Sequence, residues 1–253
     1  MKRIFYRFPI LLPFLLILVS CTPQKKLIYF KNIEEGKQYS VNQFVYRLQY
    51  GDVLYVSVYS INEQAAQLFS STGKSVVNMQ NDMSAYLHGF VINESGEINL
   101  PLVGMLKVSG LTIEQTALLI QEQIREYFYD AVVDVKLLSF QITILGEVNK
   151  PGTYRVNYPR INIFEAIGLA GDLNVYGKRD ITLVRETSEG VAIFKMDLKD
   201  RNIMAHECYY LLPNDIIYVE PHKAKVFGFN TVPITLLFTT ISSLILILNY
   251  INN

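Results

Sequence analysis

Residues 46–59 read YRLQYGDVLYVSVY, and this stretch decides the fold of the first half of the chain. Apolar and polar residues alternate on both sides of Gly51-Asp52, a pattern typical of two strands joined by a turn. A hairpin is predicted further on, where residues 88–93 and 97–101 flank a turn, and Pro101 should end its second strand at a sheet edge.

A helix is predicted next. Thr112 and Gln115 have the spacing of a capping box, and apolar residues recur at helical intervals from Ile113 to Phe128. Residues 132–137 return as a strand. Together these elements predict a compact α+β domain over residues 44–139.

A second domain is predicted directly after the first. Residues 141–148 read QITILGEV, a strand, and the following NKPG is a turn with Pro and Gly in the expected order. Asn162 can cap a short helix. Three more strands are expected, at residues 181–184, 191–196 and 216–219. This order predicts a small β-grasp domain over residues 140–222.

The N-terminus has the pattern of a secretory signal peptide over residues 1–20, with a basic start and then an apolar run. It ends in LVSC, which resembles the lipobox of bacterial lipoproteins and makes Cys21 the expected site of lipid (palmitate) attachment. The alternative is an ordinary signal peptide with an incidental cysteine. Residues 21–43 are polar and poorly periodic, and we interpret them as the lipidated N-terminus and a tether.

The C-terminus carries a long apolar segment. From Pro233 to Ile251 no residue is charged, and as a helix this segment would be roughly 28 Å long, close to the thickness of the hydrocarbon core of a bilayer. A transmembrane helix within residues 223–253 is the prediction.

One side of this predicted helix is faintly polar. At about 100° per residue, five Ser, Thr and Asn residues lie within about 80° of one another, opposite the main apolar side. These pore-lining candidates are Thr231, Thr235, Thr239, Ser242 and Asn249. In a single-pass anchor the hydroxyls would instead bond to carbonyls of their own helix, and Leu246 interrupts the polar stripe.

Composition excludes several classes of function. The chain has 23 basic and 23 acidic residues, so it lacks the basic excess of a nucleic-acid-binding protein. Its three histidines, His88, His206 and His222, are far apart and form no metal-binding motif, and no nucleophile elbow or P-loop is present. We therefore expect no enzyme, no cofactor, no metal site and no nucleic-acid partner. Cys208 is expected to be a small buried apolar group.

Several motifs carry a family resemblance. Residues 46–58, together with GEINLPLVG at 96–104 and VSGLT at 108–112, resemble the polysaccharide biosynthesis/export domain. ILGEVNKPGTY at 144–154 resembles the start of a soluble-ligand-binding β-grasp domain. In this order, the motifs are similar to those of the Wza-type outer-membrane polysaccharide export lipoproteins.

The resemblance implies an octameric homo-oligomer, a ring whose C-terminal helices form a pore in the outer membrane and whose other domains face the periplasm. Capsular or exopolysaccharide would pass through it, delivered by an inner-membrane chain-length regulator of the tyrosine autokinase type. This chain departs from the family in having one β-grasp domain instead of two, and a shorter and more apolar C-terminal helix.

The width of the lumen limits how few copies of the chain could form a ring for a polysaccharide. Eight helices packed in a ring leave a lumen of about 7 Å radius, whereas four leave about 2 Å, too little for a hydrated sugar chain. The alternative to a conduit is a membrane-anchored scaffold or sugar-binding protein without a pore of its own. The chain has 17 tyrosines that could stack on sugars, but the sequence does not identify a sugar site.

Overall fold

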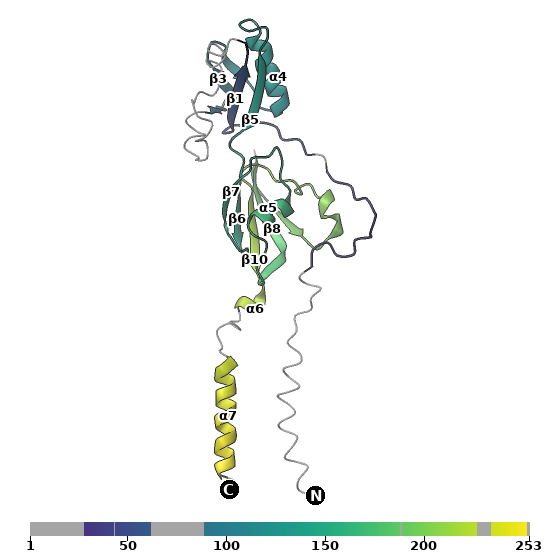
Figure 1. The fold of residues 1–253 in the computed structure, drawn as a ribbon, viewed down its shortest axis with the longest axis vertical. Coiled ribbons are helices and arrows are strands. Elements are labelled where there is room, and N and C mark those ends of the chain that lie inside the picture. The colour runs from purple at the N-terminus through teal and green to yellow at the C-terminus, as the bar shows by residue number, and fades with distance from the viewer. Residues whose placement is uncertain (1–27, 43, 62–88, 188, 227–233, 252–253) are drawn as a thin grey trace.

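The computed structural model of the chain describes residues 28–42, 44–61, 89–187, 189–226 and 234–251. In Figure 1 two sheet-containing units follow one another along the long axis, and a separate helix lies beyond the second unit. Each unit has its own hydrophobic core, the first built from residues between 48 and 135 and the second from residues between 140 and 219. This mixed architecture confirms the predicted α+β class.

The first unit is organised around strand β1 (Val53–Tyr59). It lies between β2 (Phe90–Val91) and β5 (Val132–Leu137), and both pairings are antiparallel. Leu54 and Val56 of β1 are fully buried, because alternate residues of a strand point to the same face. The alternation seen in the sequence therefore marks the buried face of this sheet.

Helix α4 (Ile113–Ile124) packs its apolar side on this sheet, with Ile120 and Ile124 fully buried. Its start is the predicted capping box. The backbone N–H of Gln115 donates to the Thr112 hydroxyl at 3.2 Å, and the backbone N–H of Thr112 donates to the Gln115 side chain at 3.0 Å. Two backbone donors of the first turn are thereby satisfied, as the sequence predicted.

Two local predictions for this unit were wrong. Residues 46–50 form no strand, although Gly51 does make the predicted turn with φ +86°. The hairpin is also shifted, because β3 (Glu97–Leu100) pairs with β4 (Gly104–Lys107) rather than with residues 88–93. The short strand β2 pairs with β1 instead, and this tertiary partner could not be identified from a local pattern.

Asp52 forms a buried polar centre beside the Gly51 turn. One carboxylate oxygen accepts from the Tyr46 hydroxyl at 2.8 Å and from the Gln49 backbone N–H at 2.9 Å, and the other accepts from the Ser139 hydroxyl at 3.1 Å. Burial raises the pKa of Asp52, and the three hydrogen bonds offset only part of that effect.

This raised pKa predicts a pH dependence of stability. A carboxyl with a higher pKa in the folded state binds more protons when folded, so the free energy of unfolding should fall as pH rises from 3.8 through the folded-state pKa of Asp52. The measurement is urea unfolding of the detergent-solubilised chain, followed by circular dichroism at a series of pH values. Asp52→Asn should lack this part of the slope, and equal slopes for both proteins would contradict the prediction.

The second unit is a five-stranded mixed sheet with one short helix, α5 (Ile163–Leu169). Its strands are β6 (Gln141–Gly146), β7 (Gly152–Arg155), β8 (Gly177–Thr187), β9 (Gly190–Asp197) and β10 (Ile216–Pro221). The order across the sheet is β7-β6-β10-β8-β9, and only the β6–β10 pairing is parallel. The predicted strand pair, helix and later strands are all present; the β-grasp name and the domain bounds stay predictions.

Residues 29–34 run along the second unit before the chain enters the first; we call them the N-terminal strap. Backbone N–H groups of Phe30 and Lys31 donate to the carbonyls of Leu198 and Lys199 at 3.3 and 2.7 Å. The Phe30 ring lies 4.4 Å from the ring of Phe164 on α5. The segment interpreted from sequence as a tether thus contributes directly to the packing of the second unit.

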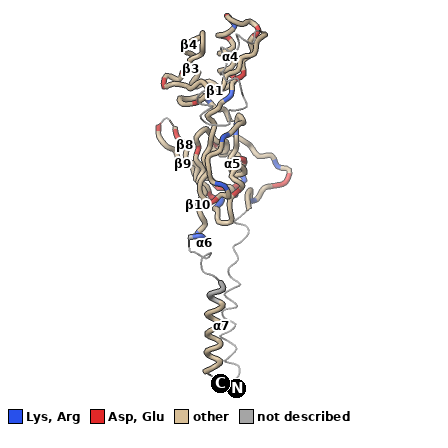
Figure 2. The backbone as a smooth tube through the Cα atoms, turned by 60° about the vertical axis from the view of Figure 1, so that its left-hand side comes forward, with Lys and Arg blue, Asp and Glu red and all other residues tan. Residues whose placement is uncertain are grey.

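The C-terminal part contains two helices, α6 (Lys223–Val226) and α7 (Ile234–Ile251), and Figure 2 shows basic residues on α6 and no charged residue along α7. Lys225 of α6 pairs with Glu147, and this hydrogen bond lowers the pKa of the Glu147 carboxyl. The predicted transmembrane helix within 223–253 is corrected here: among the residues that the structure describes, no helix is both long and apolar enough to cross a membrane.

Candidate functional site

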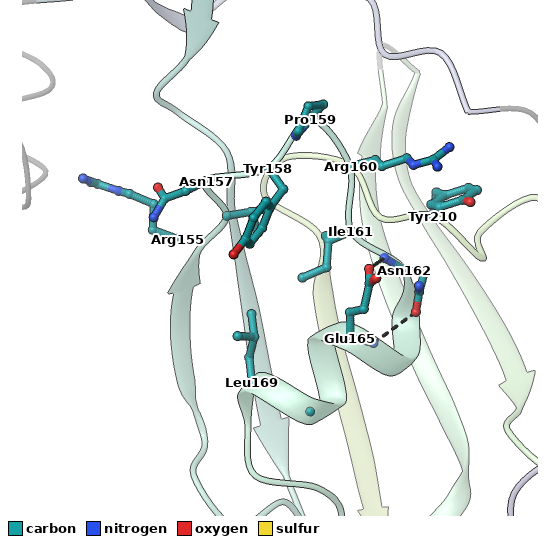
Figure 3. A pocket seen from close by; sticks show the side chains of 12 residues that line it. Arg155, Asn157, Tyr158, Pro159, Arg160, Ile161, Asn162, Glu165, Leu169 and Tyr210 are labelled. Carbon is teal, nitrogen blue, oxygen red and sulfur yellow. Dashed lines mark hydrogen bonds between the residues drawn. The ribbon is translucent and has the colours of Figure 1, made fainter.

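The best-formed candidate site in the described part of the second unit is a pocket of about 960 Å³ between strand β7 and helix α5. We call it the β7–α5 pocket. In Figure 3 its side chains come from the end of β7, the loop that follows, helix α5 and the distant Tyr210. The lining residues are Arg155, Val156, Asn157, Tyr158, Pro159, Arg160, Ile161, Asn162, Glu165, Gly168, Leu169 and Tyr210.

One side of the pocket is held by the start of α5. The Asn162 side chain accepts from the backbone N–H groups of Phe164 and Glu165, both at 3.0 Å, and the Glu165 carboxylate accepts from the Asn162 N–H at 2.8 Å. Glu165 has the only carboxylate among the residues that line the pocket, and the capping box engages one of its two oxygens. The polar groups of Asn162 and Glu165 therefore fix the position of the loop.

A segment from much later in the chain forms the adjoining wall. The backbone N–H of Leu211 donates to the Ile161 carbonyl, and the N–H of Ile163 donates to the Tyr209 carbonyl, both at 3.0 Å. These bonds bring Tyr210 beside Arg160, whose Cζ lies 5.3 Å from the centre of the Tyr210 ring. Figure 3 shows the two side chains next to each other.

The Tyr210 ring is fixed by further aromatic neighbours. Its centre is 5.0 Å from that of Tyr209 and 5.4 Å from that of Phe44. The Tyr210 carbonyl also accepts from the Arg185 guanidinium at 3.3 Å. A ring held on several sides is a preorganised platform, which lowers the entropy cost of binding a ligand.

Tyr158 is the most exposed aromatic residue that lines the pocket. Its side chain is 74% exposed, and Figure 3 shows its ring over the end of helix α5, on the same side of the pocket as Leu169. Its aromatic face is therefore available to a ligand that enters the pocket. The pocket volume lies within the range of ligand sites, which combine an apolar lining with a few directed polar groups.

This arrangement suits binding and not covalent chemistry. Guanidinium groups donate several hydrogen bonds in one plane, and aromatic faces accept the C–H faces of flat or ring-shaped ligands. Within the described residues, no group of three or more His, Cys, Asp or Glu could hold a metal ion.

The site residues predicted from sequence lie elsewhere. Thr239, Ser242 and Asn249 are exposed on one side of α7, about 80° wide, and Thr235 belongs to the same helix. The Ser242 hydroxyl donates to the Phe238 carbonyl of its own helix at 2.7 Å. Cys21 and Thr231 lie outside the described residues, so lipid attachment and the pore lining stay predictions.

Cys208 is fully buried, as predicted. Burial raises the pKa of its thiol to about 11, although the nearby Arg185 acts in the opposite direction. A thiol with so high a pKa carries almost no thiolate at neutral pH, so it acts as an apolar core group.

No site was predicted from the sequence at the β7–α5 pocket. Arg155, Tyr158 and Arg160 stand within six residues of one another, and this Arg-Tyr-Arg spacing was the one signal available. Nothing in the sequence pointed to Tyr210 as part of a site. It lines the pocket only because its segment pairs through the backbone with a segment about fifty residues earlier in the sequence.

The glycine in α5 allows a test of how open the pocket is. A Cβ built on Gly168 meets no atom within 4 Å, and Gly168 lies in a helix, so Gly168→Ala should raise the free energy of unfolding by about 0.5–1 kcal/mol. Gly171 is the matched control, since its φ of +73° makes alanine unfavourable, and Gly171→Ala should lower it by about 1 kcal/mol. Urea unfolding measures both, and a destabilising Gly168→Ala would contradict an open pocket.

Comparison with known proteins identifies the class. Residues 40–138 match the family described as polysaccharide biosynthesis/export protein. This range covers the whole first unit, including the sheet around β1 and helix α4. The resemblance to the Wza-type polysaccharide export proteins is therefore confirmed.

Individual relatives agree with this class. The chain is 27% identical over 188 residues to the EPS I polysaccharide export outer membrane protein EpsA of Ralstonia solanacearum, which covers 72% of this chain and 50% of the relative. It is 26% identical over 198 residues to the protein of the same name from Ralstonia nicotianae, covering 72% and 49%. This chain thus spans about half the length of these relatives.

Proposed function

We propose that this chain is an outer-membrane component of polysaccharide export, and that copies of it assemble into a ring through which capsular or exopolysaccharide leaves the periplasm. The observation that carries the proposal is the similarity to polysaccharide export outer membrane proteins over 72% of the chain. It includes the domain matched to the export family.

The exposed surface of α7 supports assembly. Its described side chains are exposed all round, including Phe238, Ile241, Leu244 and Leu248. An apolar helix with no covering partner is unfavourable in water, so the helix needs cover from other copies of the chain. In a ring, the α7 helices of neighbouring copies would pack side by side and turn Thr239, Ser242 and Asn249 toward the lumen, where hydroxyl and amide groups suit a passing sugar chain.

The remaining parts of the proposal follow from the same picture. Cys21 carries lipid and the two sheet-containing units face the periplasm. An inner-membrane chain-length regulator of the tyrosine autokinase type supplies the polymer. An octamer has a lumen wide enough for a hydrated sugar chain.

The test is a deletion of the gene in its own host, complemented with the full chain or with a Cys21→Ser variant. Loss of surface polysaccharide, with polymer accumulating in the periplasm, supports a conduit. Unchanged surface polysaccharide would overturn the proposal. Radiolabelled palmitate incorporated by the full chain and not by Cys21→Ser would test lipid attachment separately.

Detergent-extracted protein provides a second measurement. Native mass spectrometry should find one large, discrete oligomer. A monomer in every detergent, together with polysaccharide that is no longer made rather than retained in the periplasm, would favour the alternative of an anchored scaffold or sugar-binding protein without a pore.

A further inference from the structure

We infer that the β7–α5 pocket binds a segment of an acidic polysaccharide, with sugars bearing carboxylates. This inference rests on the proposed function in polysaccharide export and adds the chemical class of the polymer and the residues that contact it. The relatives' names specify no such site.

The charge of the pocket is the first argument. Its twelve lining residues include two arginines and a single carboxylate, that of Glu165. One oxygen of this carboxylate is engaged by the Asn162 backbone N–H within the capping box. The chain as a whole has no basic excess, so the exposed guanidinium of Arg160 at the open pocket favours an anionic ligand there.

The geometry of Arg160 is the second argument. The guanidinium lies over the face of Tyr210 with Cζ 5.3 Å from the ring centre. Stacking uses the flat face of a guanidinium and leaves its N–H edges for a planar acceptor. A carboxylate is the acceptor that matches this edge best, because it can take two parallel hydrogen bonds.

The aromatic surface is the third argument, and it favours a sugar over a small inorganic anion. Tyr158 presents an exposed ring at the pocket (Figure 3), and a phosphate or sulfate ion makes no use of such a face. A pyranose ring has an apolar face that can lie on an aromatic ring while its substituents reach polar groups at the sides. A pocket of about 960 Å³ has room for more than one sugar unit.

The proposed export function limits how tightly the pocket can bind the polysaccharide. A polymer that must move on requires a site that binds and releases each segment easily. The open position of the pocket, with Tyr158, Arg160 and Leu169 exposed, fits weak binding to a chain that passes over the surface. A single oligosaccharide should therefore bind weakly, with a Kd on the order of 1 mM.

The experiment uses the full chain in detergent and oligogalacturonate of eight to ten sugars as the acidic probe, with malto-oligosaccharide of equal length as the neutral probe. Saturation-transfer NMR and titration calorimetry give the affinities at low and physiological salt. Oligogalacturonate should bind about tenfold more tightly than the neutral probe, and this preference should shrink as salt rises. Equal binding of the two probes, or no binding of either, would overturn the inference.

Variants locate the binding. Arg160→Gln should weaken oligogalacturonate about tenfold, whereas Arg125→Gln, an exposed arginine of the first unit, should leave it unchanged. Tyr158→Ala should weaken both probes, with the exposed Tyr129→Ala as its control. Gly168→Gln keeps a good helix former in α5 and fills open space in the pocket, so it should also weaken binding without unfolding the protein. Normal binding by all three pocket variants would overturn the assignment of the site.

The two proposals fail in different ways. If the gene deletion leaves export intact while the purified chain binds oligogalacturonate through Arg160, the export function fails and the pocket stands. If deletion stops export but the assembled oligomer binds no acidic probe, the pocket assignment fails, and its surface is then best explained as a contact between neighbouring copies.

Discussion

Ile241→Lys is expected to abolish export, whereas Thr239→Lys is expected to preserve it. Both residues are exposed on α7 in the single chain, so either lysine should leave the fold of one copy intact. They point about 160° apart around the helix and differ by only about 3 Å along its axis. In the proposed ring Thr239 faces water, and Ile241 faces apolar side chains of neighbouring copies.

The size of the effect follows from desolvation. A lysine placed against apolar neighbours loses its hydration, which costs several kcal/mol in each copy of a ring. Ile241→Lys should therefore break the detergent-stable oligomer and reduce surface polysaccharide by more than about tenfold, since a loss of 1.4 kcal/mol is already tenfold in an equilibrium constant. Thr239→Lys should keep the oligomer and most of the export.

The measurement is quantification of surface polysaccharide, with native mass spectrometry of the same strains. Leu244→Lys repeats the apolar-side substitution one turn further along the helix. If both sides tolerate lysine, α7 forms no packed ring and the scaffold alternative gains support. If neither side tolerates it, α7 is covered all round and its polar side lines no lumen.

Asp215→Ala is expected to cause the largest loss of stability in the second unit. Arg185 on β8 donates to both oxygens of Asp215, at 2.9 and 2.6 Å, and the Leu212 backbone N–H donates to the same carboxylate at 2.8 Å. The Asp215 side chain is 1% exposed. Removing it leaves a largely buried guanidinium and a backbone N–H without their acceptor, which should cost about 3–5 kcal/mol.

The pKa of Arg185 is consistent with this pairing. Burial acts to lower the pKa of the guanidinium, but the hydrogen bonds and charge of Asp215 outweigh it and the net shift is upward. Because Arg185 also donates to the Tyr210 carbonyl, loss of Asp215 should loosen the wall of the β7–α5 pocket as well. We therefore expect weaker binding of the acidic probe along with lower stability.

Urea unfolding of the solubilised chain measures the stability change, and hydrogen exchange of peptides from β8 and β10 localises it. The double variant Arg185→Met/Asp215→Leu should recover much of the loss, because it leaves no unpaired buried charge. Asp134→Ala is the control, since Lys136 and Asp134 form an exposed ion pair at 3.2 Å, and it should cost less than about 1 kcal/mol. Similar losses for the two aspartates would contradict the importance of burial.

The two helix starts show what could be predicted from sequence. Thr112 with Gln115, and Asn162 with its neighbours, form their capping boxes as expected, because each box is closed by groups within three residues of one another. The alternation in β1 likewise marked a buried face, since strand geometry points every second side chain the same way. The burial of Cys208 also followed from residue type.

The wrong predictions share a different feature. The β3–β4 pairing and the strap on the second unit depend on which segments meet in space. The predicted transmembrane helix is not found among the described residues. For the hairpin and the strap, a local pattern could not identify the partner segment, because packing decides it.

The sequence alone determined the α+β class, the order of the two units and the resemblance to polysaccharide export proteins, because periodicity, caps and motifs are properties of short segments. The tertiary structure alone decided where a ligand could bind. Tyr210 is held beside Arg160 by backbone hydrogen bonds between residues 161–163 and residues 209–211. The buried Arg185–Asp215 pair stabilises the second of these segments, because Arg185 also donates to the Tyr210 carbonyl. This site is formed by contacts between segments that are far apart in the sequence. Bringing those segments together has an entropy cost, which the packing of the whole sheet offsets, so no local sequence pattern could predict the site.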